Sequence, residues 1–333
     1  MDFSNYGGEV MMRAAWYERA GPAPEVFEVG EMAAPAAGPG EVRVRIHFSG
    51  VNPGDTKKRA DWVGSGLPFP RVVPHSDGAG VIESVGDGVD PGRIGRRVWV
   101  YGAQSYRAFG TAAELTTVPA EQAVDLPAEV GDELAACLGI SGITAHRAVF
   151  GDGSVAGKSV LVHGVRGGVG LMAAQLALRD GATVVGTVRR SSDLDQATPG
   201  AVALDAADPA AAIRAHAPAG VDRIIEVSLS DNADLDAAVI APDGIIAAYA
   251  TRHERPAIPF WPLLFANVTI RLLGSDDFPA AAKREAAQQL TAAASEGALS
   301  IPVGDLLPLS RIAEAHDRVD TGARERVLLS IPA

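Results

Sequence analysis

The chain has 333 residues, of which 47% are hydrophobic and 21% charged, so it can bury the cores of two domains and is not expected to be disordered over most of its length. Its net charge of −12 argues against general binding to nucleic acid or to an anionic membrane, although one folded face could still be basic. No segment approaches the roughly 20 apolar residues of a spanning helix, and no secretory signal opens the chain, so we expect a cytoplasmic protein.

The first 130 residues consist of short segments broken by glycine and proline. Residues 1–11 show no hydrophobic period and predict a flexible N-terminal extension. From Met12 onward, apolar segments at 42–48, 80–86 and 96–102 are typical of strands, and turn-forming residues separate them. This part of the chain therefore predicts a compact, β-rich domain.

After Gly131 the pattern changes to alternating helices and strands. A helical segment at 131–150, interrupted at Ser141-Gly142, contains the only cysteine, Cys137, which we expect to be a buried small side chain. Strands are then predicted at 158–164, 183–188, 221–227 and 244–250, with helices at 167–181, 211–217 and 231–240. This alternation predicts an α/β fold with the doubly wound parallel sheet of a Rossmann domain. A long helix at 279–299 and a terminal strand follow.

The strongest local signal is the glycine-rich turn between the first of these strands and its helix. Glycines let the backbone approach a pyrophosphate closely, and the N–H groups and positive end of the helix favour its charge. Gly167 and Gly170 match the second and third glycines of the dinucleotide-binding fingerprint, whereas Val165 replaces the first. The alternative is a tight turn without a ligand. The predicted cofactor-binding residues here are Gly164, Arg166, Gly167, Gly168, Val169 and Gly170.

The end of the second strand indicates which cofactor is bound. Folds that prefer NAD place an acid there to accept from the ribose 2′-hydroxyl, but this chain has Val188. Arg189 and Arg190 follow and could hold a 2′-phosphate through charge-assisted contacts. We therefore predict NADPH, bound by these two arginines and by Thr187, with a solvated arginine pair on a surface turn as the alternative.

Five segments of the chain together resemble a known family. They read SGVNPGDTKKR (49–59), PHSDGAGVIESVGDGV (74–89), AACLGISGITAHRAV (135–149), VLVHGVRGGVG (160–170) and IAEAHDRVDTG (312–322). In this order they are similar to the zinc-free, zeta-crystallin-like quinone oxidoreductases of the medium-chain dehydrogenase/reductase superfamily. The resemblance implies a β-rich, GroES-like catalytic domain at 12–133 and 277–333, a Rossmann NADPH-binding domain at 134–276, and an active site in the cleft between them.

Three positions depart from the family's usual pattern. Arg96 stands where an aspartate is usual, Lys57 where a tyrosine is frequent, and Ala250 where a glycine is common after the fifth Rossmann strand. Because of these departures, the resemblance predicts the fold more firmly than it predicts the substrate.

The zinc ligands of the superfamily's alcohol dehydrogenases are missing. Their Cys, His and Glu positions resemble Asn52, Ser76 and Asp77, and the structural-zinc cysteines are absent from the sequence. Asparagine and serine are poor zinc ligands, so we predict no metal. The neighbouring His75 is expected to form local hydrogen bonds or to line a pocket.

A site without zinc must polarise its substrate with hydrogen-bond donors or rely on the cofactor. The predicted catalytic residues are Asn52, which the resemblance places near the nicotinamide, Lys57, which could donate to an oxyanion, and Tyr101, which follows a strand near the cleft. The alternative for Lys57 is a surface lysine. The resemblance also assigns cofactor contacts to Thr144, Tyr249 and Ala250, although Thr144 could instead bond its own helix backbone.

We therefore expect an NADPH-dependent reductase of a quinone or an α,β-unsaturated carbonyl. The alternatives are an enoyl-thioester reductase and a non-catalytic NADPH-binding or RNA-binding crystallin-like protein. The sequence has no hydrolase motif such as G-x-S-x-G or HExxH. The resemblance also implies a homodimer, in which the apolar segment 267–274 would pair as an edge strand.

Overall fold

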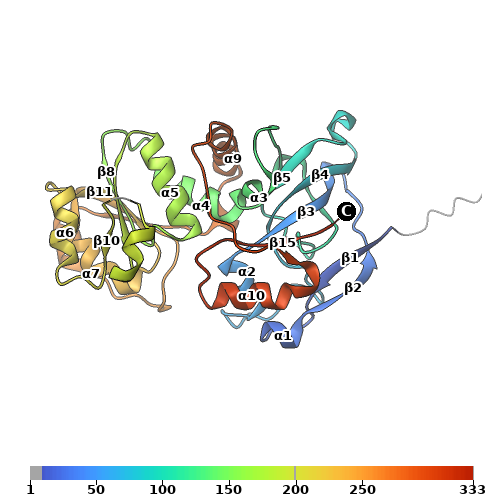
Figure 1. The fold of residues 1–333 in the computed structure, drawn as a ribbon, viewed down its shortest axis with the longest axis horizontal. Helices are drawn as coiled ribbons and strands as arrows, with labels where there is room; N and C mark the ends of the chain where they lie inside the picture. The colour runs from blue at the N-terminus through green and yellow to red at the C-terminus, as the bar shows by residue number, and fades with distance from the viewer. Residues whose placement is uncertain (1–9, 199, 333) are drawn as a thin grey trace, which may run out of the picture. The chain divides into compact units, whose positions relative to one another are not determined.

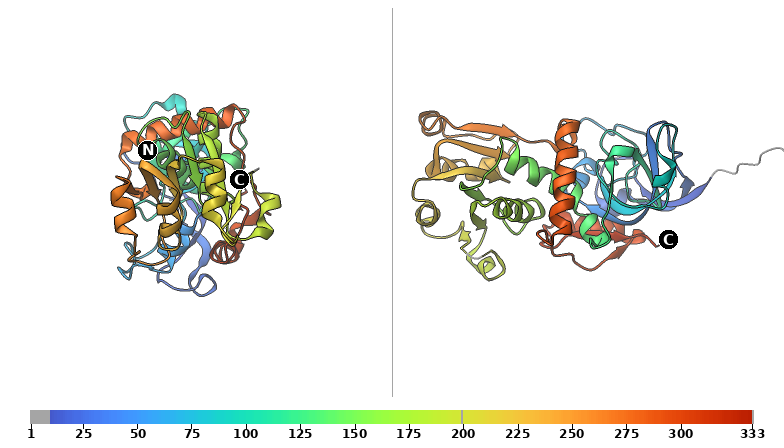
Figure 2. Two further views of the ribbon diagram at one scale, coloured as in Figure 1. Left: turned by 90° about the vertical axis from the view of Figure 1, so that its left-hand side faces the viewer. Right: turned by 90° about the horizontal axis from the view of Figure 1, so that it is seen from above.

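The computed structural model describes residues 10–198 and 200–332, which form two compact units. One unit runs to Ile140 and resumes at Pro302, and the other spans Ser141–Ile301. We expected these boundaries at 134 and 276. The second unit extends further because helix α9 (Ala280–Ser295), orange-red in Figure 2, belongs to it, and there Gln289 accepts a hydrogen bond from His146 Nε2 at 3.0 Å.

The first unit is β-rich, as predicted. Its strands are β1 (Met11–Trp16), β2 (Glu28–Ala33), β3 (Glu41–Val51), β4 (Asp77–Val85), β5 (Arg97–Val100), β6 (Leu115–Pro119), β7 (Ala123–Asp125), β14 (Leu307–Pro308) and β15 (Val327–Ser330). Its α-helices are α1 (Ala23–Val26), α2 (Pro53–Arg59), α3 (Asp132–Ala135) and α10 (Ile312–Asp320). Single 3₁₀ turns lie at Pro91–Arg93, Ala120–Gln122 and Leu309–Arg311.

The long strand β3 organises this unit. It pairs with β4, β6 and β15, and the described sheet runs in the order β14-β15-β3-β4-β5-β7, with β6 also on β3. Figure 1 labels β15, β3, β4 and β5 of this sheet. Val42, Val44 and Ile46 alternate along β3 and are buried in the core. The period-2 pattern of apolar residues in the sequence therefore reflects the burial of one face of this strand.

The described residues include only the last two residues of the predicted N-terminal extension. Residues 1–9 lie outside the described residues. Met11, the last residue of the predicted extension, instead begins β1 and pairs with Ala33 of β2.

The second unit alternates strands and helices. Its strands are β8 (Ser159–Val162), β9 (Thr183–Val188), β10 (Val202–Ala203), β11 (Val221–Glu226), β12 (Ile240–Ala248) and β13 (Thr269–Leu272). Its helices are α4 (Ile143–Phe150), α5 (Gly168–Arg179), α6 (Pro209–His216), α7 (Leu229–Val239), α8 (Phe260–Phe265) and α9. Short 3₁₀ segments lie at Ser191–Gln196 and Ser275–Asp277.

The strand order identifies the fold of this unit. The sheet runs β10-β9-β8-β11-β12-β13, and its neighbouring strands in the described residues are all parallel. In chain order this is the 3-2-1-4-5-6 arrangement of a Rossmann fold, which confirms the predicted fold class. The order reverses between β8 and β11, so their carboxyl ends form the switch point where such sheets bind ligands.

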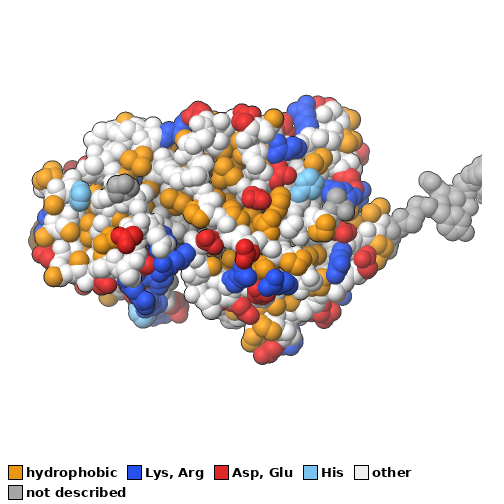
Figure 3. Space-filling view, in the orientation of Figure 1, with side chains coloured by type: hydrophobic (Ala, Val, Ile, Leu, Met, Phe, Trp, Pro, Cys, Tyr) orange, Lys and Arg blue, Asp and Glu red, His pale blue; other side chains and the backbone are white. Residues whose placement is uncertain are grey.

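Three further features bear on the predictions. The interruption predicted at Ser141-Gly142 is a π-helical segment, Leu138–Gly142, between α3 and α4. Among the described helices, none combines the length and the apolar character needed to cross a membrane. On the face drawn in Figure 3, Lys and Arg side chains stand in small groups among Asp and Glu side chains.

Candidate functional site

The glycine-rich turn has the geometry that the sequence predicted. After β8, Gly164 adopts φ +65° and its carbonyl accepts a hydrogen bond from Gly167 N–H at 2.8 Å. Helix α5 then begins at Gly168, and no side chain caps its first N–H groups. A Cβ at Gly170 would lie only 2.4 Å from the Gly164 oxygen, so this close turn excludes any side chain there. The free N–H groups suit an anion.

The turn is fixed to the neighbouring strand β9. Val165 N–H donates to the Thr187 carbonyl at 3.1 Å, and the Thr187 hydroxyl lies 3.4 Å from the Gly164 nitrogen. The same hydroxyl lies 2.9 Å from His163 Nδ1. Thr187 therefore holds the turn with both its backbone and its side chain, and its predicted contact with the cofactor stays a prediction.

The segment after β9 contains a carboxylate that the sequence analysis did not consider. Val188 is buried and Arg189 and Arg190 are exposed, but the following 3₁₀ segment brings Asp193 to 3.3 Å from Arg166 Nη1. Arg166 is thus paired with an acid, and its predicted contact with the cofactor stays a prediction.

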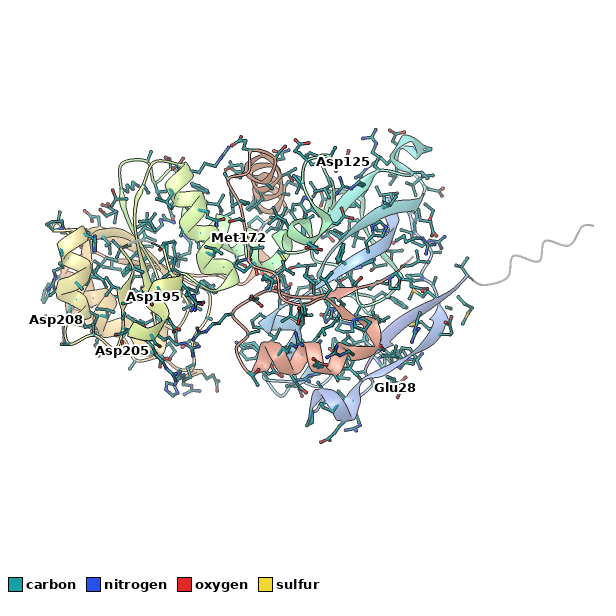
Figure 4. All side chains as sticks on the ribbon, viewed as in Figure 1. Glu28, Asp125, Met172, Asp195, Asp205 and Asp208 are labelled. Carbon is teal, nitrogen blue, oxygen red and sulfur yellow. The ribbon has the colours of Figure 1, made fainter. Side chains whose placement is uncertain are left out.

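The start of this 3₁₀ segment is held by a second acid. Asp205 accepts hydrogen bonds from the Ser191 N–H at 2.8 Å and from its hydroxyl at 2.7 Å. Asp205 and Asp195 are labelled in Figure 4. These contacts fix the backbone that directly follows Arg190.

The remaining predicted cofactor residues of this unit lie near the same edge of the sheet or in α4. Tyr249 follows β12, and its N–H donates to the Glu226 carbonyl at the end of β11 at 3.0 Å. Ala250 accepts from Leu229 N–H at 3.2 Å. Burial raises the pKa of the Tyr249 hydroxyl. Thr144 is buried within α4.

In the first unit, Asn52 is fully buried between two charged side chains. Its Nδ2 donates to Asp77 at 2.8 Å, and its Oδ1 accepts from Arg326 Nη2 at 2.9 Å. The Asn52 amide therefore bridges a carboxylate and a guanidinium, and its orientation is set by both. Sequence reasoning missed Arg326, because 274 residues separate it from Asn52 and no local pattern marks it.

Asp77 also approaches the backbone closely. Both of its carboxylate oxygens lie 2.9 Å from the Ile140 nitrogen, and a Cβ at Gly139 would lie 2.1 Å from one of them. Glycine at 139 is thus needed for the carboxylate to reach Ile140. The neighbouring Cys137 is buried as expected, and burial raises the pKa of its thiol.

The other two predicted catalytic residues have different surroundings. Lys57 is exposed on α2, with its Nζ 5.4 Å from the centre of the Trp62 ring, and Trp62 itself is 66% exposed. Tyr101 is buried, and its hydroxyl donates to the Glu121 carbonyl at 3.4 Å. Hydrogen bonds therefore join Asn52 to Asp77 and Arg326, whereas Lys57 and Tyr101 lie in separate environments.

Comparison with known proteins identifies the family. Two family models match the chain, described as "Alcohol dehydrogenase GroES-like domain" (residues 38–128) and "Zinc-binding dehydrogenase" (residues 168–288). Quinone oxidoreductase of Homo sapiens is 30% identical over 338 residues, which cover 97% of this chain and 98% of that protein. The chain belongs to the zeta-crystallin-like quinone oxidoreductase family. The predicted resemblance is thereby confirmed.

Two further relatives refine this result. Quinone oxidoreductase of Rattus norvegicus is 40% identical over 185 residues, so the match spans 54% of this chain and about half, 54%, of that relative. The solved structure of a mycobacterial protein complexed with NADPH superposes with a TM-score of 0.81 at 27% identity, covering 96% of this chain and 99% of the other. The fold thus extends over nearly the whole chain.

Proposed function

We propose that this family member is an NADPH-dependent reductase of quinones or α,β-unsaturated carbonyl compounds. The observation that carries the proposal is the glycine turn at the switch point of the second unit, with the uncapped start of α5 and two arginines after β9. A mycobacterial relative was solved with NADPH. Bound NADPH would supply the hydride. The test is steady oxidation of NADPH by a simple para-quinone, and cofactor binding without turnover of quinones or enones would overturn it.

The cofactor preference rests on Arg189 and Arg190. A charge-assisted contact to phosphate is worth about 1.5–3 kcal/mol, and about 1.4 kcal/mol is a tenfold change in affinity. We expect NADPH to bind roughly ten- to a thousandfold more tightly than NADH, less if the side chains stay solvated. Replacing both arginines with alanine should weaken NADPH binding and leave NADH nearly unchanged. Lys158→Ala, at the amino end of β8, is the control.

The decisive measurement is the pair of dissociation constants in each variant. The preference should shrink as salt rises, because the arginines are exposed. Equal constants for NADPH and NADH in the wild type would show that the arginines do not hold a phosphate.

We also propose that catalysis needs no zinc. Asn52 stands at a position that resembles a zinc-ligand position, and both ends of its amide are already hydrogen bonded. The Arg326 guanidinium beside it adds a positive charge to the same cluster, which does not suit a cation. Activity should survive exhaustive chelation, and elemental analysis should find less than one zinc per chain. A stoichiometric zinc whose removal stops turnover would contradict this.

The three predicted catalytic residues differ in their surroundings, and we propose a different role for each. Asn52 is a positioning residue, since both ends of its amide are occupied, whereas exposed Lys57 can donate to an oxyanion that develops on the substrate. Lys57→Met should lower kcat/KM about tenfold without changing the NADPH dissociation constant. Lys58→Met is the matched control. Tyr101→Phe should have a smaller effect, because its hydroxyl donates to a backbone carbonyl.

We further propose a homodimer formed through β13. In the described sheet this strand pairs only with β12, so one of its edges is open. Leu272 on β13 is 75% exposed, and α8 just before it exposes Phe260, Trp261 and Phe265. An open edge beside exposed aromatic side chains suits a second copy.

Light scattering at micromolar concentration tests the dimer. The expected mass is twice 34.3 kDa, and Leu272→Lys should shift it toward the monomer. A monomeric wild type would contradict the proposal.

A further inference from the structure

Three titratable side chains meet at the carboxyl ends of β8 and β11, directly behind the phosphate turn. They are His163 after β8, Glu226 at the end of β11 and Asp236 on α7, and all three are fully buried. His163 Nε2 lies 2.9 Å from Asp236 Oδ1 and 3.5 Å from Glu226 Oε2. We name these three residues the buried triad.

The other side of the His163 ring reaches the turn itself. Its Nδ1 lies 2.9 Å from the Thr187 hydroxyl, which in turn lies 3.4 Å from the Gly164 nitrogen. If the imidazole is protonated, Nδ1–H donates to Thr187. If it is neutral with its proton toward Asp236, Nδ1 accepts from Thr187 instead. The proton content of the triad therefore sets the direction of the His163–Thr187 hydrogen bond, whereas the Gly164 N–H donates to the same hydroxyl in both states.

Near neutral pH we expect the triad to hold one proton beyond the single ring proton of neutral histidine. Without this additional proton on His163 or Glu226, two carboxylates would be buried within 4.8 Å of each other with no compensating charge among the three residues, which is costly. Burial, together with the nearby Asp236 charge, raises the pKa of Glu226 to about 7. Burial lowers the pKa of His163, but the hydrogen bond to Asp236 and the two carboxylates outweigh this and raise it.

The elements packed around the triad contribute polar and titratable groups of their own. Glu226 accepts from the Asn232 amide on α7 at 3.0 and 3.1 Å and from the Ser228 N–H. Tyr249, after β12, interacts electrostatically with Glu226 but stays neutral, because burial raises its pKa. β9 contributes Thr187, which carries no charge. The exchangeable proton therefore belongs to His163 and Glu226.

We propose that His163 is a positioning residue for the dinucleotide, held by Asp236 and Glu226 beneath Gly164, and that the buried triad takes up a proton when the cofactor's pyrophosphate binds at the turn. This inference rests on the proposed cofactor site. The negative charge of the pyrophosphate favours the protonated triad, and by linkage the loss of that proton weakens cofactor binding.

Calorimetry measures this coupling directly. NADH binding is titrated near pH 7 in two buffers of different ionisation enthalpy, because the 2′-phosphate of NADPH titrates itself near pH 6. We expect a fractional proton uptake per NADH, and an affinity that falls about threefold to tenfold between pH 6 and pH 8.5. Glu226→Gln should abolish the uptake and flatten the pH dependence. Asp222→Asn, an exposed acid at the amino end of β11, should keep both.

The outcomes distinguish this inference from the proposed function. If the wild type binds neither NADH nor NADPH, the proposed function fails. If it binds them without proton uptake, or if Glu226→Gln retains the uptake, the inference fails and the cofactor site stands. The wild-type measurement decides even if the variant does not fold. The same three side chains could hold a metal ion, so the titration is repeated with EDTA, and uptake that EDTA removes would also overturn the inference.

Discussion

The two units each bury a histidine network, and the histidine pKa values are lowered in one network and raised in the other. In the first unit, His75 Nε2 lies 2.9 Å from His316 Nε2, and both rings are fully buried. Burial lowers the pKa of His75 to about 3, and burial, followed by electrostatic interactions with His75 and Arg59 that disfavour a second proton, lowers the pKa of His316 well below its usual value. In the second unit, the carboxylates beside His163 reverse the effect of burial.

The comparison shows what decides the protonation of a buried imidazole. Burial alone favours the neutral ring, and an adjacent carboxylate is needed to keep it charged. The partners of His75 are the Ser49 hydroxyl at 2.8 Å and another imidazole, so one ring of the pair donates and the other accepts. His75 also has φ +75°, a strained conformation for a residue with a side chain, which its surroundings must stabilise.

The largest expected effect is the loss of the charged histidine. His163→Leu would leave Glu226 and Asp236 buried without a cationic partner and should reduce the free energy of unfolding by about 3–5 kcal/mol at pH 8. His316→Leu removes a neutral partner and should cost about 1–3 kcal/mol. Urea unfolding followed by pulse-labelled hydrogen exchange, read separately on peptides of each unit, measures both. Equal losses would show that His163 is neutral like His316.

The second prediction concerns the pH dependence of stability, which should have opposite signs in the two units. Unfolded histidines bind protons below pH 6.5, but folded His75 and His316 exclude them. The first unit should therefore lose stability as pH falls below 6.5, by up to about 1.4 kcal/mol per pH unit for each histidine. The raised pKa values of His163 and Glu226 stabilise the second unit at low pH. That contribution is lost as pH rises through about 7 for Glu226.

A matched pair of substitutions isolates this effect. In the first unit, the unfolding free energy should depend on pH less steeply in His316→Gln below pH 6.5, because unfolding then takes up about one proton fewer. His253→Gln, at an exposed position, should leave both slopes unchanged. Slopes of the same sign in the two units would contradict the comparison.

The fold was predictable wherever the pattern is local. β9 spans Thr183–Val188, as predicted from its β-branched residues, and the glycine turn follows β8 as expected. The two-residue strand β10 and the short helix α8 were missed, since neither is long enough to show a period. The boundary at 276 differs from that of the compact unit, because nothing in the sequence of α9 shows which unit it packs against.

Only the part of the candidate site formed by residues close together in the sequence was predictable. The glycine turn between β8 and α5 lies within one strand–turn–helix unit, so the spacing of its glycines predicted its geometry. The Asn52–Arg326 and His75–His316 contacts join residues 274 and 241 positions apart, and only the fold brings them together. Asp193 could not be predicted from the strand end at Val188, because only the 3₁₀ segment that follows brings this acid to Arg166.

The smallest expected effect compares the hydroxyl groups that contact the two networks. Ser49→Ala removes the partner of His75 Nδ1, and Thr187→Val removes the partner of His163 Nδ1. Each should cost about 1–2 kcal/mol of stability, because each leaves a buried ring nitrogen without its hydrogen bond. Only Thr187 also contacts the phosphate turn, at Gly164. Thr187→Val should therefore weaken NADPH binding about fivefold, Thr187→Ser should restore it, and Ser49→Ala should leave it unchanged. Fluorescence titration with NADPH measures all three, and equal weakening by Ser49→Ala and Thr187→Val would show that the loss reflects general destabilisation, because Ser49 belongs to the first unit and the turn to the second.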